Sequence, residues 1–178
     1  MKNIWVVGIL AALAASAIGA SCAWAAEKAG TEKGHLAPLE RFIGHWVIDA
    51  KWSNGQALHA RNVYEWGLGK QIIKTRTFVK NDDSEYQRYE GILAWNPKKQ
   101  CLFHVSFAFN GDMTEALIES KDRDTLNIGW NPYREGEAGQ VRQTIKFKDQ
   151  DSFVWTVWVK NGTEWQQIME GTWKRKDK

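Results

Sequence analysis

Hydrophobic and polar positions alternate along most of the chain, from residue 45 to about residue 174. Clusters of Asn, Gly and Asp interrupt the alternation at short intervals, which is typical of antiparallel strands joined by tight turns. The pattern predicts ten strands, over residues 45–52, 57–67, 70–80, 85–95, 101–110, 113–120, 125–132, 140–148, 152–160 and 163–174. Because nearly all connections are short, each strand is expected to pair with its neighbour in sequence.

A sheet of this kind has two unpaired edges, and closing into a barrel is the usual way to remove them. The predicted fold class is therefore all-β, an up-and-down antiparallel β-barrel of about ten strands. Several strands place bulky residues on one face, as in Phe103, Val105, Phe107 and Phe109, or in Trp165, Met169 and Trp173. Alternation alone does not show which face of a strand points into the barrel.

A helical pattern precedes the first strand. Its apolar residues recur at steps of three and four, namely Leu36, Leu39, Phe42 and Ile43. They predict a short helix, ended by Gly44, that caps or plugs one end of the barrel. Gly44 would also allow close approach of the backbone, and Trp46 is large enough to close the end of the barrel.

Residues 1–25 have the organisation of a secretory signal peptide. Lys2 supplies a positive charge, an apolar segment of small residues follows, and Ala23-Trp24-Ala25 carries the small residues that signal peptidase recognises. The mature protein would then be periplasmic or secreted, in a Gram-negative bacterium, with no membrane span after cleavage. Lipoprotein anchoring at Cys22 is a minor alternative, because Gly19 stands where such signals place a bulky apolar residue.

The remaining chain suits one domain, with a linker over residues 26–34 and the barrel over 35–178. Lys and Arg number 24 against 21 Asp and Glu, and the formal net charge is +3. So balanced a composition gives no broad positive field for a polyanion, and no nucleic-acid partner is expected. Loss of Cys22 leaves Cys101 alone, which excludes a disulfide within the mature chain.

Two segments carry a resemblance to a known family. LAPLERFIGHW, a short apolar helix leading into Gly-x-Trp, resembles the entry of calycin-type barrels, the lipocalins and their bacterial relatives. YEGILAWNPKKQCLFHVSFAFNGDMTEA resembles the middle of a bacterial family of secreted lipocalin-like domains of unknown function. The resemblance covers about residues 36–174 and implies a fold and a compartment, but no activity. Its motif residues are interpreted as structural: Gly44, Trp46, Gly91 and Pro97.

Polar residues inside otherwise apolar strands are the candidates for a binding site, because a ligand-binding barrel places a few polar groups in an apolar lumen. Six residues meet this description: Tyr64, Arg76, Arg88, Glu90, His104 and Gln143. We expect them to contact a small hydrophobic or amphipathic ligand. Structural explanations stay open, with Arg76 as a solvated outer residue, Glu90 as the partner of Arg88, and His104 as a packed or surface histidine.

Two alternative functions also stay open. The first is a lumenal enzyme of isomerase or lyase type acting on a small organic acid. In it Tyr64, Arg76 and Glu90 would act as orienting group, anion clamp and general acid or base, which requires Arg76 and Glu90 to face inward together. The second is a filled, structural barrel with a protein partner. Hydrolase motifs are absent from the sequence, so a binding protein is favoured over an enzyme, as a monomer or a homodimer.

No cofactor and no metal site are expected. The four histidines, His35, His45, His59 and His104, are scattered and have no cysteine pair beside them. Nitrobindin, a relative of these barrels, binds haem through a histidine near its C-terminus, whereas no histidine follows His104 here. The sequence therefore does not predict a nitrobindin-like haem site.

Overall fold

The computed structural model describes residues 34–81, 84–131 and 140–176. These residues form ten strands: β1 (Gly44–Lys51), β2 (Ala57–Gly67), β3 (Ile72–Asn81), β4 (Ser84–Asn96), β5 (Cys101–Ala108), β6 (Met113–Ser120), β7 (Thr125–Asn131), β8 (Val141–Phe147), β9 (Ser152–Asn161) and β10 (Glu164–Lys176). They also form two short 3-10 helices, η2 (Ala37–Phe42) and η3 (Leu68–Lys70). The predicted signal peptide and nearly all of the predicted linker lie outside the described residues.

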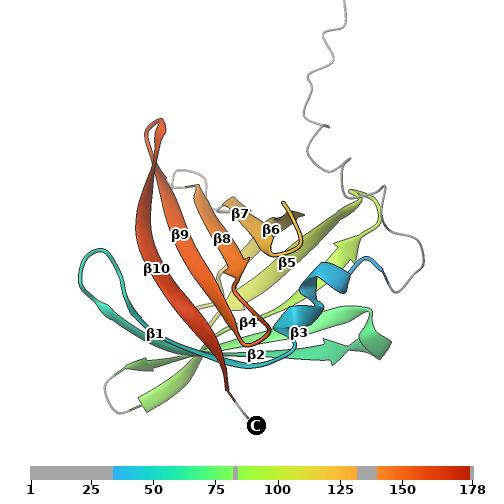
Figure 1. Cartoon of the computed structure of the whole chain (residues 1–178), viewed down its shortest axis with the longest axis horizontal. Coiled ribbons are helices and arrows are strands. Elements are labelled where there is room, and N and C mark those ends of the chain that lie inside the picture. The colour runs from blue at the N-terminus through green and yellow to red at the C-terminus, as the bar shows by residue number, and fades with distance from the viewer. Residues whose placement is uncertain (1–33, 82–83, 132–139, 177–178) are drawn as a thin grey trace, which may run out of the picture.

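The strands form one closed antiparallel barrel. Each strand pairs with the next in sequence, and β1 pairs with β10 to close the sheet. In Figure 1, β1 to β4 cross beneath β5 to β10, and η2 lies to one side of the strands. The predicted up-and-down barrel is confirmed, and the predicted strand limits agree with the observed ones to within two residues.

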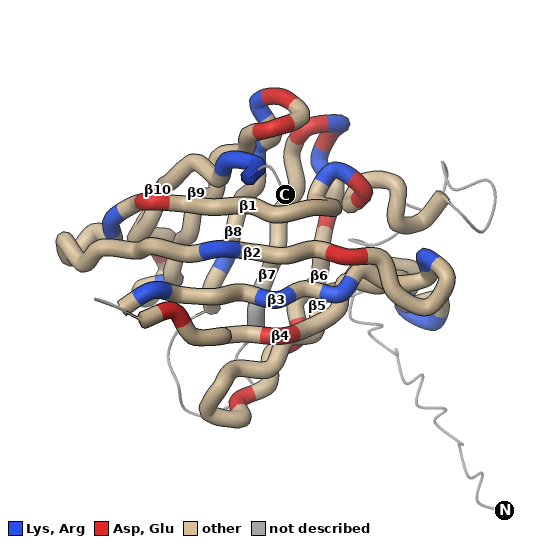
Figure 2. Tube along the Cα trace, turned by 90° about the horizontal axis from the view of Figure 1, so that it is seen from below, with Lys and Arg blue, Asp and Glu red and all other residues tan. Residues whose placement is uncertain are grey.

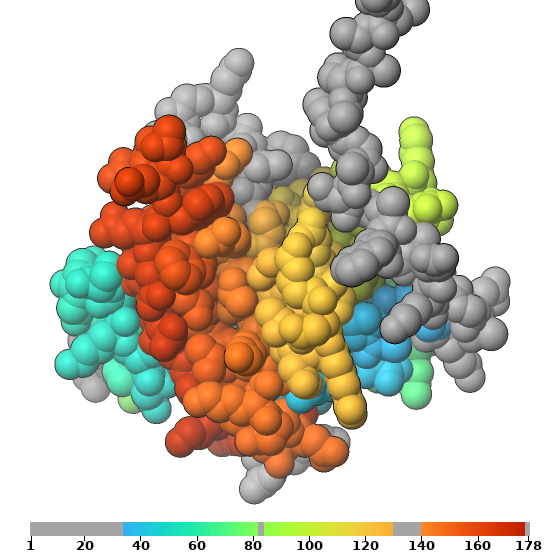
Figure 3. Space-filling model, turned by 45° about the horizontal axis from the view of Figure 1, so that its top comes forward, coloured from blue at the N-terminus to red at the C-terminus, as the bar shows by residue number. Residues whose placement is uncertain are grey.

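The segment before β1 forms a 3-10 helix, with Pro38 in its first turn. Leu36, Leu39 and Phe42 are three residues apart, which is the repeat of a 3-10 helix, and all three are buried. Arg41 anchors the helix to the β6–β7 turn through a hydrogen bond of 2.5 Å to Asp124. Figure 3 shows this helix, in blue, on the surface beside the yellow segment.

The helix closes one end of the barrel with an aromatic cluster. The ring centroid of Phe42 lies 5.1 Å from that of Phe147 and 5.5 Å from that of Phe153. Trp46 is completely buried, packs on Phe153 and donates its indole N–H to the carbonyl oxygen of Phe42 at 2.6 Å. The guanidinium of Arg175 covers the Trp46 ring at 4.3 Å. This end of the lumen is therefore sealed by packed side chains.

The two glycines that were interpreted as structural leave no room for a side chain. Gly44 has a φ of 125°, and a Cβ there would lie 2.6 Å from a terminal nitrogen of Arg175. At Gly91 a Cβ would lie 2.2 Å from the carbonyl oxygen of Val105 on β5. Any larger residue at Gly91 would push the backbones of β4 and β5 apart.

Pro97 lies in the turn between β4 and β5. The side-chain oxygen of Asn96 accepts hydrogen bonds from the backbone N–H groups of Lys98 and Lys99, each at 3.0 Å. The Asn-Pro pair thus builds a tight turn from local hydrogen bonds, as its sequence predicts.

A β-bulge in β4 interrupts the two-residue period toward the end of the barrel opposite η2. Thr77 on β3 pairs with Tyr89, whereas the next residue, Phe78, pairs with Gln87. Arg88 is therefore the extra residue of the bulge. Strict alternation would place Arg88 and Glu90 on the same face of β4, and the bulge breaks that alternation between them.

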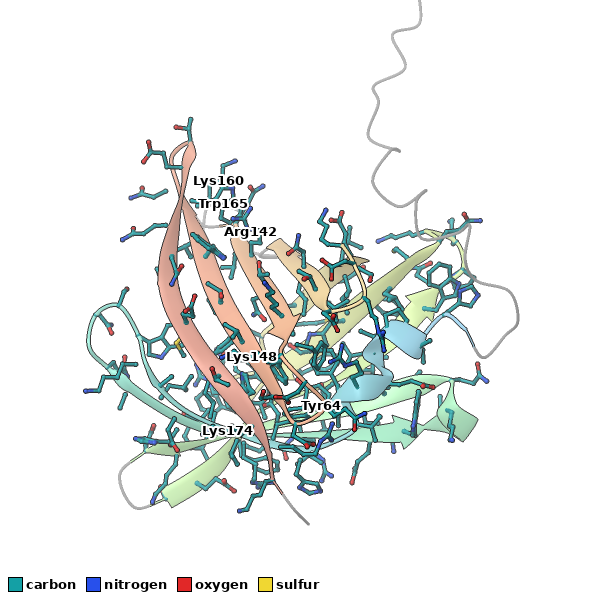
Figure 4. All side chains as sticks on the ribbon, viewed as in Figure 1. Tyr64, Arg142, Lys148, Lys160, Trp165 and Lys174 are labelled. Atoms are coloured by element: carbon teal, nitrogen blue, oxygen red, sulfur yellow. The ribbon has the colours of Figure 1, made fainter. Side chains whose placement is uncertain are left out.

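A second bulge lies in β10, at Ile168, between residues 167 and 169. Strict alternation predicts that Trp165 and Trp173 share a face, and this prediction is wrong. Trp173 pairs with the inward-facing Phe153 and is buried, whereas Trp165 lies on the other face, with Arg142 4.6 Å from its ring centroid. Figure 4 shows Arg142 and Trp165 together on the barrel, far from Tyr64.

Residues of both charge signs are interspersed along β1 to β4, as Figure 2 shows. On β5 and β6, in contrast, apolar side chains point outward. Phe107 is 52% exposed, and Met113 and Leu117 are each 41% exposed. The aromatic face of β5 is therefore its outer face, which turns His104 and Ser106 toward the lumen.

Candidate ligand-binding cavity

A cavity of about 750 Å³ occupies the lumen. It extends from Leu39 and Phe42, at the sealed end, to the opposite end, where Gln56, Asn81 and Tyr86 line it. This volume lies within the range of pockets that bind small molecules, about 300–1,000 Å³. The open lumen argues against the filled-barrel alternative.

The polar side chains of the cavity wall are concentrated in one half of it, which also contains apolar residues such as Leu58, Val79, Leu93 and Ile118. Strands β2 to β6 contribute most of the polar side chains, namely Asn62, Tyr64, Thr75, Thr77, Tyr86, Arg88, Tyr89, His104, Ser106 and Thr114. Strands β7 to β10 contribute mainly apolar ones, namely Ile128, Val141, Ile145, Phe153, Trp155, Val157, Ile168 and Trp173. A molecule with one polar side and one apolar side would match both halves.

Tyr64 lies on the polar wall beside the plug, where its ring stacks on Phe42 with a centroid distance of 5.2 Å. Asn62, two residues earlier on β2, donates its side-chain N–H to the Tyr64 hydroxyl at 3.1 Å. Burial raises the pKa of Tyr64 to about 12, so the hydroxyl stays protonated and can act as a donor. The amide oxygen of Asn62 is buried and has no hydrogen-bond partner in the described structure.

His104 faces the cavity from β5. Its Nε2 atom lies 3.4 Å from the hydroxyl of Thr75 on β3. Burial lowers the pKa of His104 to about 4, so the imidazole is neutral at pH 7. His104 is thus a neutral hydrogen-bonding group of the wall.

Further polar groups of the lumen are paired with one another. The hydroxyls of Ser106 and Thr114, on neighbouring strands, lie 3.0 Å apart. Gln143, on β8, accepts a hydrogen bond from the indole N–H of Trp155 at 3.0 Å. Gln143 is the polar exception in the apolar half of the wall, and its hydrogen bond fixes the position of Trp155.

Arg88 lies at the open end and is the only charged residue among the described residues that line the cavity. Its guanidinium lies 4.6 Å from the Phe109 ring centroid, and its hydrogen bond to the Tyr89 hydroxyl raises the pKa of Arg88 above its ordinary value. Among the described residues, no carboxylate forms an ion pair with it. Arg88 therefore presents a positive charge to the mouth of the cavity, and no described residue supplies a counter-charge.

Two of the six candidate residues lie outside the cavity. Arg76 is on the outer face of β3, where it forms an ion pair of 2.7 Å with Glu65. Glu90 is exposed on the outer face of β4 and accepts a hydrogen bond from Gln87 at 2.9 Å. The expectation that these two residues contact a lumenal ligand is therefore corrected.

The physical reason for this correction lies in the residues that share their faces. Lys74 and Lys80 occupy the same face of β3 as Arg76, and several cations on one face favour solvent over an enclosed lumen. Because Arg76 and Glu90 point outward, they do not meet Tyr64 in the lumen. The arrangement required by the enzyme alternative is not formed.

Some residues that line the cavity were not among the six candidates, although the alternation of their strands was enough to place them on the inward face. Asn62 shares a face with Tyr64, and Thr75 and Thr77 occupy the face of β3 opposite its cations. Tyr86 and Tyr89 lie on either side of the bulge in β4, so alternation could not have placed both in the wall.

Neither a metal centre nor a membrane helix emerges from residues 34–81, 84–131 and 140–176. In these ranges no three His, Cys, Asp or Glu side chains are grouped as metal ligands. No helix in the same ranges has the length and hydrophobicity needed to cross a membrane.

A closed up-and-down barrel of ten antiparallel strands, with a short helix at one end and an open lumen, defines a lipocalin-like fold. No family model and no curated protein matches the sequence. Among solved structures, the chain is similar to Rv2717c from M. tuberculosis, with 10% identity, a TM-score of 0.55, and coverage of 80% of this chain and 98% of the other. It is also similar to the S-type phycobiliprotein lyase CPES from Guillardia theta, with 9% identity, a TM-score of 0.50, and coverage of 78% and 90%. At these identities the likeness supports the fold alone.

Proposed function

We propose that the protein binds a small amphipathic molecule in the lumen of the barrel. The observation that carries this proposal is the cavity of about 750 Å³, whose polar side chains lie mostly on β2 to β6 and whose wall on β7 to β10 is mainly apolar. A filled structural barrel would have no such space. Four candidate residues line the cavity, namely Tyr64, Arg88, His104 and Gln143.

The location of this activity remains a prediction from the sequence. Residues 1–25, which carry the signal-peptide pattern, lie outside the described residues. We propose that the mature protein acts in the periplasm or outside the cell, as a carrier or sensor of its ligand. The oligomeric state, a monomer or a homodimer, also remains a prediction.

Binding can be tested with N-phenyl-1-naphthylamine, a neutral apolar dye whose fluorescence rises when it leaves water. Ala60 lines the cavity from β2, so Ala60→Phe should fill part of it and lower the affinity at least tenfold. His59, the preceding residue, points outward and contacts Asp49, so His59→Phe is the matched control. Circular dichroism would verify that both variants are folded.

The proposal requires saturable binding to the wild type and to His59→Phe, and weakened binding to Ala60→Phe. Absence of saturable binding to the folded wild type, or equal affinity in both variants, would overturn it. If the dye binds as expected, native mass spectrometry of protein prepared from a periplasmic extract would identify a co-purifying molecule by its mass.

A further inference from the structure

We propose that the ligands of this cavity are amphipathic organic acids that carry an uncharged hydroxyl group. The acidic group would bind Arg88 at the open end, and the hydroxyl would bind Asn62 deeper in the lumen. This inference rests on the proposed function and names the class of ligand that the same cavity takes.

The positive charge of Arg88 favours an anionic ligand over a cationic one. Arg88 provides the only formal charge on the wall among the described residues, and His104 is neutral there at pH 7. Tyr64 is protonated and also neutral. A carboxylate at Arg88 would gain charge-assisted hydrogen bonds in a partly apolar site, whereas the guanidinium would repel an ammonium group.

The surroundings of Arg88 favour a fixed guanidinium. Phe109 lies against it at 4.6 Å, and the Tyr89 ring centroid is 5.5 Å away. Contacts with aromatic faces hold a guanidinium by cation–π attraction and leave its N–H edge available to an acid. The bulge in β4 is what brings this residue to the lumen.

A second, independent observation points to a donor group on the ligand. The side-chain oxygen of Asn62 is buried without a hydrogen-bond partner, although its nitrogen is paired with Tyr64. If the amide were turned over, its nitrogen would be the unpaired atom instead, so one polar atom is left over in either orientation. An unpaired buried polar atom is costly, and a ligand hydroxyl can serve as donor or acceptor to it.

The register of the strands gives the spacing of the backbone at the two residues. Thr77 pairs with Asn62 on one side and with Tyr89, the neighbour of Arg88, on the other. Adjacent strands are about 4.8 Å apart, so roughly 10 Å separates the two backbone positions. A rigid two-ring acid with a hydroxyl at its far end has a length of this order, so it can test both contacts in one molecule.

Three naphthalene compounds test the two contacts separately by isothermal titration calorimetry. The compound 6-hydroxy-2-naphthoate has both groups, 2-naphthoate lacks the hydroxyl, and 2-naphthol lacks the acid. We expect the wild type to bind the hydroxy acid most tightly. Arg88→Gln should weaken both acids about tenfold or more and leave 2-naphthol unchanged.

The variant Asn62→Leu should act on the other group. It should weaken the hydroxy acid and 2-naphthol severalfold and leave 2-naphthoate unchanged. The matched control for charge is Arg76→Gln, since Arg76 lies on the outer face of β3 and should not alter any of the three affinities.

The outcomes separate this inference from the proposed function. Binding of N-phenyl-1-naphthylamine without any preference for the acids, or with equal losses in Arg88→Gln and Arg76→Gln, would overturn the assignment of an acid and leave lumenal binding intact. Equal affinities for 2-naphthoate and the hydroxy acid, unaffected by Asn62→Leu, would overturn the assignment of a hydroxyl. Failure of every probe, including the neutral dye, would overturn the proposed function itself.

Discussion

The two ends of the barrel differ in what their side chains contact. At the sealed end, Phe42, Trp46 and Phe153 pack on one another, and the single polar atom of Trp46 is paired with a backbone carbonyl. At the open end, Arg88 has no carboxylate partner among the described residues, and Tyr89 is 39% exposed. Both ends are built from the same strands.

The comparison indicates that the residues that stabilise the barrel and the candidate binding residue Arg88 lie at opposite ends of it. Buried aromatic packing at the sealed end contributes several kcal/mol per ring and fixes the strands. The open end can then keep a charged group, Arg88, that forms no ion pair with any described residue. We expect substitutions at the sealed end to change folding, and those at the open end to change binding.

The largest effect should come from Trp46→Ala. This change removes a completely buried ring and its hydrogen bond to Phe42, so the free energy of unfolding should fall by about 3–5 kcal/mol. Tyr89→Ala at the open end should cost less than about 1 kcal/mol. Urea denaturation of both variants measures the contrast, and equal losses would remove the distinction between the two ends.

The next effect concerns pH. Folded His104 binds a proton only near pH 4, whereas the unfolded imidazole binds one near pH 6.5. The unfolded state therefore takes up more protons in this window, and stability should fall on the order of 2 kcal/mol as pH drops from 6.5 to 4. His104→Gln should flatten the slope of stability against pH, measured by denaturation at several pH values.

The exposed His59 supplies the control for this pH dependence. His59→Gln removes a histidine that is not enclosed in the lumen, so the slope between pH 6.5 and 4 should persist. A slope that survives in His104→Gln would show that other groups cause the loss of stability in acid.

A smaller effect is expected for a hydroxyl near the plug. Tyr64→Phe removes the acceptor of the Asn62 side-chain N–H and leaves the whole amide unpaired, so stability should fall by about 1–2 kcal/mol. Tyr86→Phe, at the open end, should cost about 0.5 kcal/mol or less. Thermal unfolding of the two variants compares them, and a greater loss in Tyr86→Phe would reverse the expected order.

The smallest effects belong to ion pairs on the outside. Arg76→Gln breaks an exposed pair with Glu65 and should cost less than about 0.5 kcal/mol. Arg41→Gln should cost about 1 kcal/mol, because Arg41 also lies over the Phe147 ring at 4.0 Å and holds the helix in place. If the two changes have the same cost in urea denaturation, the helix is not stabilised by Arg41.

Much of the fold could be predicted because it depends on local pattern. The period of two and the turn residues predicted the ten strands, and short connections predicted the pairing of neighbours. The spacing of Leu36, Leu39 and Phe42 predicted the helix, although not that it would be 3-10. These features follow from side-chain geometry within a few residues.

The site was harder to predict than the fold, because it depends on which face of each strand points into the barrel. On β5 the aromatic residues face outward and His104 faces inward, which is the reverse of the usual burial preference. The bulge in β4 separates Arg88 from Glu90, and no local signal indicates it. Arg76 was the exception, since the lysines on its face already indicated an outer position.

The most direct test of lumenal binding uses the tryptophan indole N–H signals in NMR spectra. Trp52, Trp155 and Trp173 line the cavity, whereas Trp158 and Trp165 lie on the outer surface against Arg142. Titration with 6-hydroxy-2-naphthoate should shift the indole signals of the first three and leave those of the last two unchanged. Shifts confined to Trp158 and Trp165, or no shifts at saturating acid, would contradict binding within the barrel.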